Sequence, residues 1–127
     1  MKKILFILFL SIVGIYAQNL YFAAFKDIRL AKKIINTNPQ KAEKLFIEAS
    51  GYLKQIINNS ISNDKPSANA FNLMGQLYLN GWGVDKNEEK AFKLLCAASQ
   101  LGNLKAKKIL SKLNIKCKKI NFKELEQ

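Results

Sequence analysis

AFNLMGQLYLNGWGVDKNEEKAFKLLCAASQLG, residues 70–102, has the pattern of two amphipathic helices joined by a short turn. The apolar residues of the first helix recur at helical spacing and comprise Ala70, Phe71, Met74, Leu77 and Tyr78. Gly81-Trp82-Gly83 ends this helix, because glycine tolerates positive φ. The second helix begins after Asn87, has its apolar stripe at Ala91, Leu94, Leu95, Ala98 and Leu101, and closes at Gly102. The stretch therefore predicts a helical hairpin.

Similar apolar stripes lie on both sides of this hairpin. Two stripes precede it, at Tyr21, Ala24, Phe25, Ile28, Ala31 and Ile35, and then at Ala42, Leu45, Phe46, Ala49, Leu53, Ile56 and Ile57. Asn38 is a suitable N-cap and Pro39 a suitable first-turn residue between them. A fifth stripe, Ala106, Ile109, Leu110 and Leu113, continues in step through Cys117 and Ile120, which would carry that helix past Asn114.

The chain also repeats itself. Residues 38–50 align with residues 87–99, sharing Asn, Lys, Ala, Lys, Leu, Ala and Ser at matching places. We therefore expect an all-α fold of antiparallel helix-hairpin repeats. About five helices would form two hairpins plus a terminal helix, in a short right-handed superhelix.

The second hairpin resembles the Sel-one-like repeat, a relative of the tetratricopeptide repeat. The residues that carry the likeness are Ala70, Met74, Gly75, Tyr78, Gly81, Gly83, Val84, Asn87, Lys90, Ala91, Ala98 and Gly102. In that motif Gly75 and Ala91 allow two helices to cross closely, Gly81, Gly83 and Val84 form the turn, and Asn87 caps the next helix. The resemblance implies a protein–protein interaction module rather than chemistry. The layout is then a degenerate pair at 19–58, a linker at 59–65, the repeat at 66–102 and a basic end at 103–127.

The N-terminus has the pattern of a secretory signal peptide at residues 1–17. Lys2 and Lys3 precede an apolar run from Ile4 to Val13, and Ala17 offers a small residue for cleavage. The run is shorter than the ~20 residues of a spanning helix. We expect a mature N-terminus at Gln18 and a periplasmic or secreted location.

Cysteine pairing stays open at this point. Export favours a bridge between Cys96 and Cys117, because disulfides persist in oxidising compartments. A fifth helix that stayed straight would place Cys117 on the order of 12 Å beyond the level of Cys96. A bridge therefore requires that helix to break near Asn114, and two buried or unbridged thiols are the alternative.

Catalysis has little support in the sequence. The chain has no His, which removes the commonest general base and metal ligand, and two Cys alone cannot hold zinc. We expect no catalytic residues, metal or cofactor. Secreted cysteine-rich relatives have been linked to β-lactams, so a β-lactam-binding or β-lactamase-like protein is the alternative. The Ser-x-x-Lys and Lys-Thr-Gly signature of serine β-lactamases is absent.

Two surfaces are candidates for binding. Trp82 lies between two glycines and, with Tyr78, would offer an aromatic anchor, unless Trp82 folds over Tyr78 or Phe71. Lysines crowd the C-terminal end, among them Lys112, Lys116 and Lys119, and predict a basic amphipathic helix. The net charge of +12 suggests nucleic acid, but export argues against that partner. A protein or peptide in the cell envelope is the expected partner, and an anionic surface is the second alternative.

Overall fold

The computed structural model describes residues 19–127, which form an all-helical stack. A helical segment at residues 19–34 is followed by α2 (Pro39–Ser62), α3 (Ala68–Asn80), α4 (Glu88–Gln100) and α5 (Leu104–Lys112). A short 3-10 helix, η1 (Phe122–Leu125), lies near the end of the chain. No strand occurs within residues 19–127. The predicted hairpins and terminal helix are confirmed, whereas the signal peptide at residues 1–17 lies outside the described residues.

Helix caps explain where most of these helices begin. The side chains of Asn38, Ser67, Asn87 and Asn103 each accept a hydrogen bond from a backbone N–H in the first turn of the helix that follows. Pro39 occupies the first turn of α2, where no intrahelical donor is lost. Each cap bonds to a backbone N–H only three residues further along the chain, so these helix starts follow from the local sequence.

α2 is longer than the polar residues near its C-terminal end suggested. α2 continues to Ser62, so residues 59–62 of the predicted linker are helical and the connection to α3 shortens to 63–67. Ile57 and Ile61 are both buried and lie four residues apart. Their burial keeps the apolar stripe running beyond the Asn58–Ser60 stretch, and so the helix continues.

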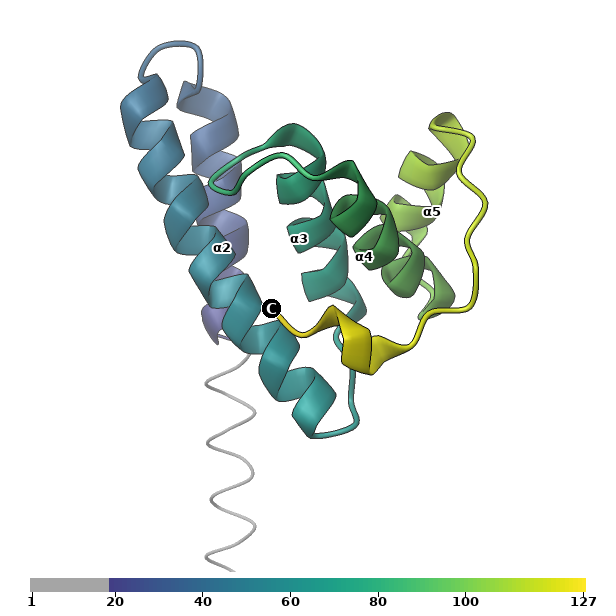
Figure 1. Ribbon diagram of the computed structural model, residues 1–127. Coiled ribbons are helices and arrows are strands. Elements are labelled where there is room, and N and C mark those ends of the chain that lie inside the picture. Colours follow the sequence, from purple (N-terminus) through teal and green to yellow (C-terminus); the bar gives the residue numbers. More distant parts are fainter. Residues whose placement is uncertain (1–18) are drawn as a thin grey trace, which may run out of the picture.

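One core joins all the helices. Its largest fully buried side chains come from α2, α3 and α4 and are Phe46, Leu53, Ile57, Phe71, Met74, Leu77, Leu94 and Leu95. Ala24, Ile28 and Ala31 extend this core into the N-terminal helical segment, and Ala106 and Leu110 extend it into α5. In Figure 1 the N-terminal segment and α2 form one end of the stack, and α5 forms the other.

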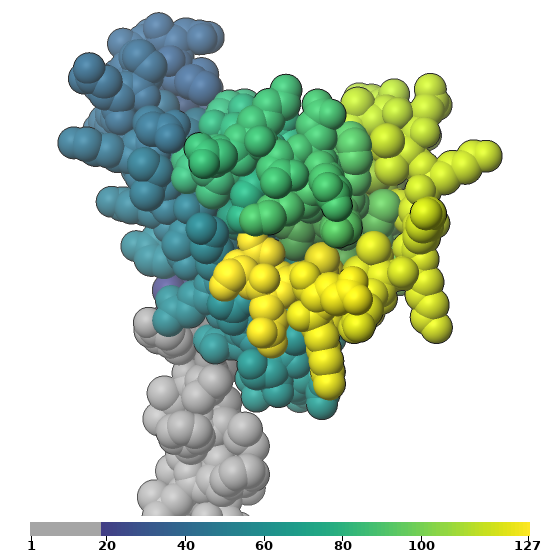
Figure 2. Space-filling model, in the orientation of Figure 1, coloured from purple at the N-terminus to yellow at the C-terminus, as the bar shows by residue number. Residues whose placement is uncertain are grey.

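The chain after α5 does not continue as a helix. Asn114 adopts a left-handed conformation with φ of 55°, and the N–H of Ile115 bonds back to the carbonyl of Leu110. The helix therefore stops at Lys112, and the expectation that it runs past Asn114 is wrong. The remainder, residues 113–127, forms a C-terminal strap that crosses α4 toward α2 (Figures 1 and 2).

Apolar residues anchor the strap to the core, and one of them, Ile120, was expected to extend the fifth helix. Ile115, Ile120 and Phe122 pack partly buried against the core, and Leu125 is buried. The Phe122 ring stacks on Phe71 of α3 with centroids 6.0 Å apart. The strap therefore covers core surface between α2 and α4.

Candidate partner-binding site

The turn between α3 and α4 is built by the glycines of the repeat motif. Gly81 caps α3 with φ of 67°, and Gly83 has φ of 70°. A Cβ on Gly83 would lie 2.6 Å from the backbone nitrogen of Ile47 in α2. Such an approach is open only to glycine, so the turn rests directly on the backbone of α2.

Close packing between α3 and α4 depends on Gly75. A Cβ there would lie 2.9 Å from Cγ of Leu95 and 3.2 Å from the carbonyl oxygen of Ala91. The predicted role of Gly75 and Ala91 at a helix crossing is thus seen in the geometry. Gly102 also has positive φ, but a Cβ on it would meet no atom within 4 Å.

Trp82 packs inward onto the first hairpin. Its ring stacks on Phe46 of α2, with centroids 5.0 Å apart and an interplanar angle of 11°. The ammonium of Lys32 lies 5.3 Å from the centre of the indole, within cation–π range. The side chain is half-buried, and its partners are Phe46 and Lys32 rather than Tyr78 or Phe71. Trp82 thereby holds the turn against the N-terminal segment and α2.

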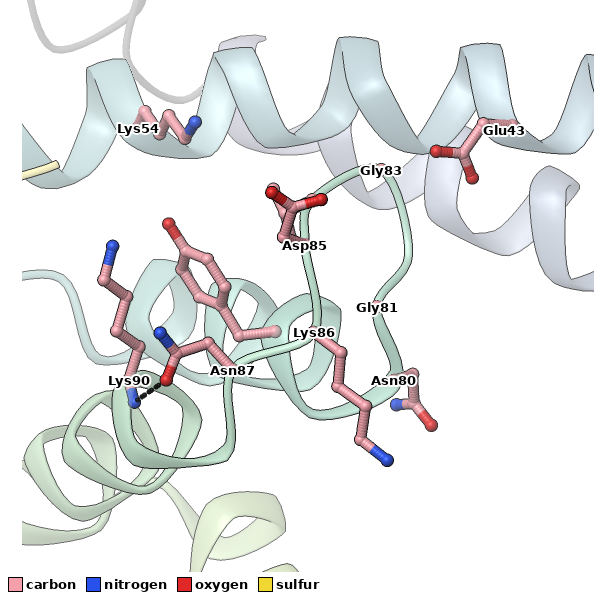
Figure 3. A pocket seen from close by; sticks show the side chains of 11 residues that line it. Glu43, Lys54, Asn80, Gly81, Gly83, Asp85, Lys86, Asn87 and Lys90 are labelled. Atoms are coloured by element: carbon pink, nitrogen blue, oxygen red, sulfur yellow. Dashed lines mark hydrogen bonds between the residues drawn. The ribbon is translucent and has the colours of Figure 1, made fainter.

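An open pocket of about 850 Å³ lies beside this turn, between α2 and the start of α4 (Figure 3). Its walls include Tyr78, Gly81, Gly83, Val84 and Asn87, so the structure brings the turn residues of the predicted motif to one place. The side chain of Asn87 accepts from the N–H of Lys90 at 3.0 Å and fixes the first turn of α4. This pocket is the candidate site.

The charges of the pocket are of both signs. Lys54 from α2 and Lys90 from α4 extend toward the same end, whereas Glu43 lies at the other end of the α2 wall and Asp85 extends from the turn toward α2 (Figure 3). Among the described residues, neither Lys54 nor Lys90 has a carboxylate oxygen within 4.0 Å. Lys86 instead pairs with Glu88 at 3.8 Å. The cationic end can therefore receive an acidic group from a partner.

Tyr78 connects the pocket to the end of the strap. Its hydroxyl donates a hydrogen bond to Oε1 of Gln127 at 3.0 Å, and the Lys90 ammonium lies 5.4 Å from the centre of its ring. Burial raises the pKa of Tyr78 above its ordinary value of 10.0, so the phenol stays protonated at neutral pH. It can act there as a hydrogen-bond donor or acceptor.

The pocket lining suits binding. Nothing in it pairs a nucleophile with a base, since lysines, carboxylates, Asn80, Asn87 and one tyrosine supply the polar atoms. In residues 19–127 no three His, Cys, Asp or Glu side chains are grouped so as to hold a metal ion. What the arrangement offers chemically is hydrogen bonding and ion pairing to a polar partner.

Cys96 and Cys117 form a disulfide, with their Cα atoms 5.5 Å apart. Because the helix ends before Asn114 and the chain reverses there, Cys117 lies beside Cys96. A straight fifth helix would have kept these two residues too far apart to bond. The amide of Gln100 supports the same crossing, because it donates to the carbonyl of Lys118 at 2.8 Å and accepts from the N–H of Ile120 at 3.3 Å. The strap is therefore tied to α4 by a covalent bond and two hydrogen bonds.

The C-terminal lysines do not share one helix face. Lys112 ends α5, whereas Lys116 and Lys119 lie on the non-helical part of the strap, and all three are exposed. α5 itself is basic and amphipathic, with Ala106 and Leu110 buried and Lys105, Lys107, Lys108 and Lys112 exposed, but it does not extend to Lys116 and Lys119 because Asn114 ends the helical geometry. These lysines also lie outside the pocket lining.

Several residues of the site could not be picked out from the sequence: Glu43 and Lys54 in α2, Asn80, Asp85 and Lys86 in the hairpin, and Gln127. Glu43 and Lys54 lie outside the apolar stripe of α2, and that stripe was the only feature of this helix that the sequence pattern could interpret. Nothing local distinguishes them from other surface charges. Only the docking of the α3–α4 turn on α2 brings them to Tyr78.

The family model of the Sel1 repeat matches residues 32–50 and 69–103. No curated protein and no solved structure matches this chain. The second match coincides with α3, the glycine turn and α4, whose geometry has just been described. The first covers the junction of the N-terminal segment with α2, where the internal repeat begins. The chain belongs to the Sel1-like repeat family.

Proposed function

We propose that this chain is an exported, non-enzymatic module that binds a protein or peptide partner of the cell envelope. Sel1 repeats mediate protein–protein interaction. The observation that carries the proposal here is the pocket formed by the Sel1 hairpin and α2, with Lys54 and Lys90 at one end and no carboxylate paired to them among the described residues. A polar partner segment with an acidic group at one end suits that pocket.

Two observations support export. The predicted signal peptide ends at Ala17, and the Cys96–Cys117 disulfide suits an oxidising compartment. N-terminal sequencing of the protein recovered from the envelope or medium should begin at Gln18. Recovery of the chain from the cytoplasm with Met1 still in place would contradict export.

A crosslinking pull-down from the envelope tests partner binding. The bait is the wild type, a pocket variant carrying Lys54→Glu and Lys90→Glu, and a control carrying Lys107→Glu and Lys108→Glu. The control makes the same charge change on exposed residues of α5, away from the pocket. We expect the wild type and the control to capture the same partner and the pocket variant to lose it, with all three melting alike.

Capture of the same partner by all three baits would contradict the pocket as the binding site. The β-lactamase-like alternative is separated by nitrocefin, which the wild-type protein should leave intact. Turnover of nitrocefin at a rate proportional to protein concentration would replace the binding proposal with a hydrolase.

A further inference from the structure

The N-terminal helical segment, residues 19–34, has two different faces. One face carries Ala24, Ile28 and Ala31, which are buried in the common core. The opposite face carries an exposed stripe at spacings of three and four residues. We call it the outer stripe, and its members are Phe22, Phe25, Lys26, Arg29 and Lys33.

The first turns of the outer stripe are aromatic. Phe22 is 59% exposed and Phe25 39% exposed, although phenylalanine is normally among the most buried residues. Tyr21 packs beside both, with ring centroids 6.0 Å from Phe22 and 6.4 Å from Phe25. Tyr21 itself is half-buried against the core, and the two phenylalanines extend this cluster onto the outside of the stack.

The following turns of the outer stripe are cationic. Lys26, Arg29 and Lys33 are all exposed, and none of them has a carboxylate oxygen within 4.0 Å among the described residues. Asp27 is the sole acidic residue of this segment, and it lies half-buried off the stripe. The stripe therefore presents aromatic rings and positive charge together, with no negative charge between them.

This combination matches the interface of an anionic bilayer. Aromatic side chains sit at the boundary between headgroups and acyl chains, while lysine and arginine contact the lipid phosphates. We propose that the outer stripe docks the protein peripherally on the surface of an anionic lipid membrane. No helix in the described part of the chain is long and apolar enough to cross a membrane.

Geometry supports this surface over the C-terminal lysines. The segment lies with α2 at the end of the stack away from α5 (Figure 1), and every residue of the outer stripe is exposed. Lys112, Lys116 and Lys119 carry charge but lie across the end of α5 and an irregular strap. The docking is independent of the proposed function, because no residue of the outer stripe lines the pocket.

Vesicle co-sedimentation tests the docking. The protein recovered from the exporting host is mixed with phosphatidylcholine vesicles, with or without phosphatidylglycerol. Four proteins with the same N-terminus are compared. Beside the wild type, the aromatic variant carries Phe22→Ser and Phe25→Ser, and the stripe charge variant carries Lys26→Gln, Arg29→Gln and Lys33→Gln. The C-terminal control carries Lys112→Gln, Lys116→Gln and Lys119→Gln. The two triple variants remove the same charge from opposite ends of the stack.

We expect wild type to bind only the anionic vesicles and to be released by added salt. The stripe charge variant should bind at least about tenfold more weakly, because each cation near an anionic surface contributes about 1 kcal/mol. The aromatic variant should bind the anionic vesicles about tenfold more weakly, and the C-terminal control should keep wild-type affinity. Matched far-UV spectra and melting temperatures show that each variant is folded.

Three outcomes would overturn the proposal. The first is wild-type protein that does not bind anionic vesicles. The second is loss of binding in the C-terminal control with retention in both stripe variants. The third is a dimer in solution that the Phe22→Ser and Phe25→Ser changes dissociate, without any vesicle binding, which would assign the outer stripe to a second copy of the chain.

Discussion

Gly83 rests on the backbone of α2 at Phe46. A Cβ on Gly83 would collide with the carbonyl carbon of Phe46, and it would lie 2.6 Å from the carbonyl oxygen of the same residue. The neighbouring Trp82 stacks its ring on the Phe46 side chain. The turn of the second hairpin therefore contacts Phe46 of the first hairpin through both its backbone and its side chain. This joint sets the shape of the pocket, since Gly83 is also part of its wall.

Gly83→Ala should destabilise the protein severely. Left-handed φ costs a residue with a side chain about 1–2 kcal/mol, and the collision with α2 adds an overpacking cost of about 1–3 kcal/mol. Gly102→Ala is the matched control, because it has positive φ and no atom within 4 Å. Chemical denaturation should show that Gly83→Ala lowers the free energy of unfolding more than Gly102→Ala does. Equal losses would mean that the turn does not sit on α2.

Gly75→Leu should lower the free energy of unfolding by at least ~2 kcal/mol, although leucine is the better helix former. The added side chain meets Leu95 and the backbone of Ala91. Gly51→Ala in α2 is the control, since a Cβ there meets nothing within 4 Å, and it should stabilise by about 0.5–1 kcal/mol. A thermal melt in which Gly75→Leu equals the wild type would refute the close crossing of α3 and α4.

Loss of the disulfide should cost about 3 kcal/mol, the value typical of a bridge between residues 21 apart. Cys117→Ser releases the strap from α4, but the packing between α3 and α4 does not depend on it. We therefore expect a lower melting temperature with helical far-UV signal retained. Dithiothreitol should lower the melting temperature of the wild type to that of the variant and leave the melting temperature of the variant unchanged. A reductant-insensitive wild type would contradict the bridge.

The repeat motif predicted the hairpin well because its signals are local. Gly75, Gly81 and Asn87 act on helices adjacent to them in the chain, so spacing alone indicates their roles. The contacts of Trp82 could not be predicted in the same way. Phe46 and Lys32 are distant in the sequence, and the family motif says nothing of residues outside the hairpin.

The strap was the main error, and its cause is physical. Cys117 and Ile120 continue the helical spacing of α5, but Cys117 is bonded to Cys96 and Ile120 packs partly buried against the core from a non-helical segment. Periodicity could not show that Asn114 takes a left-handed conformation and that the disulfide holds the chain across α4. For the same reason the charges of the pocket, Glu43 and Lys54, emerge only from the tertiary structure.

Asp27→Asn should stabilise the protein near neutral pH. Burial raises the pKa of Asp27 above its ordinary value of 3.8, Glu48 adds to the rise, and Lys26 opposes it. The folded state thus holds the proton more tightly than the unfolded chain, and stability falls as pH rises through the folded pKa. The neutral variant avoids that loss.

The gain at neutral pH should stay below ~1 kcal/mol, because the carboxyl is partly exposed and screened. It should disappear below the ordinary pKa of 3.8, where both states of the wild type are protonated. Melting temperatures of both proteins across acidic to neutral pH provide the measurement. A difference that does not vary with pH would show that ionisation of Asp27 is not its cause.

Site-specific photocrosslinking in living cells tests partner binding most directly. A photoreactive residue at Lys86 lies in the pocket wall, and one at Lys107 lies on α5 away from it. We predict that irradiation links the protein to one partner from position 86 and that position 107 gives no such product. Identical products from the two positions, or none from position 86, would contradict a partner-binding pocket between α2 and the Sel1 hairpin.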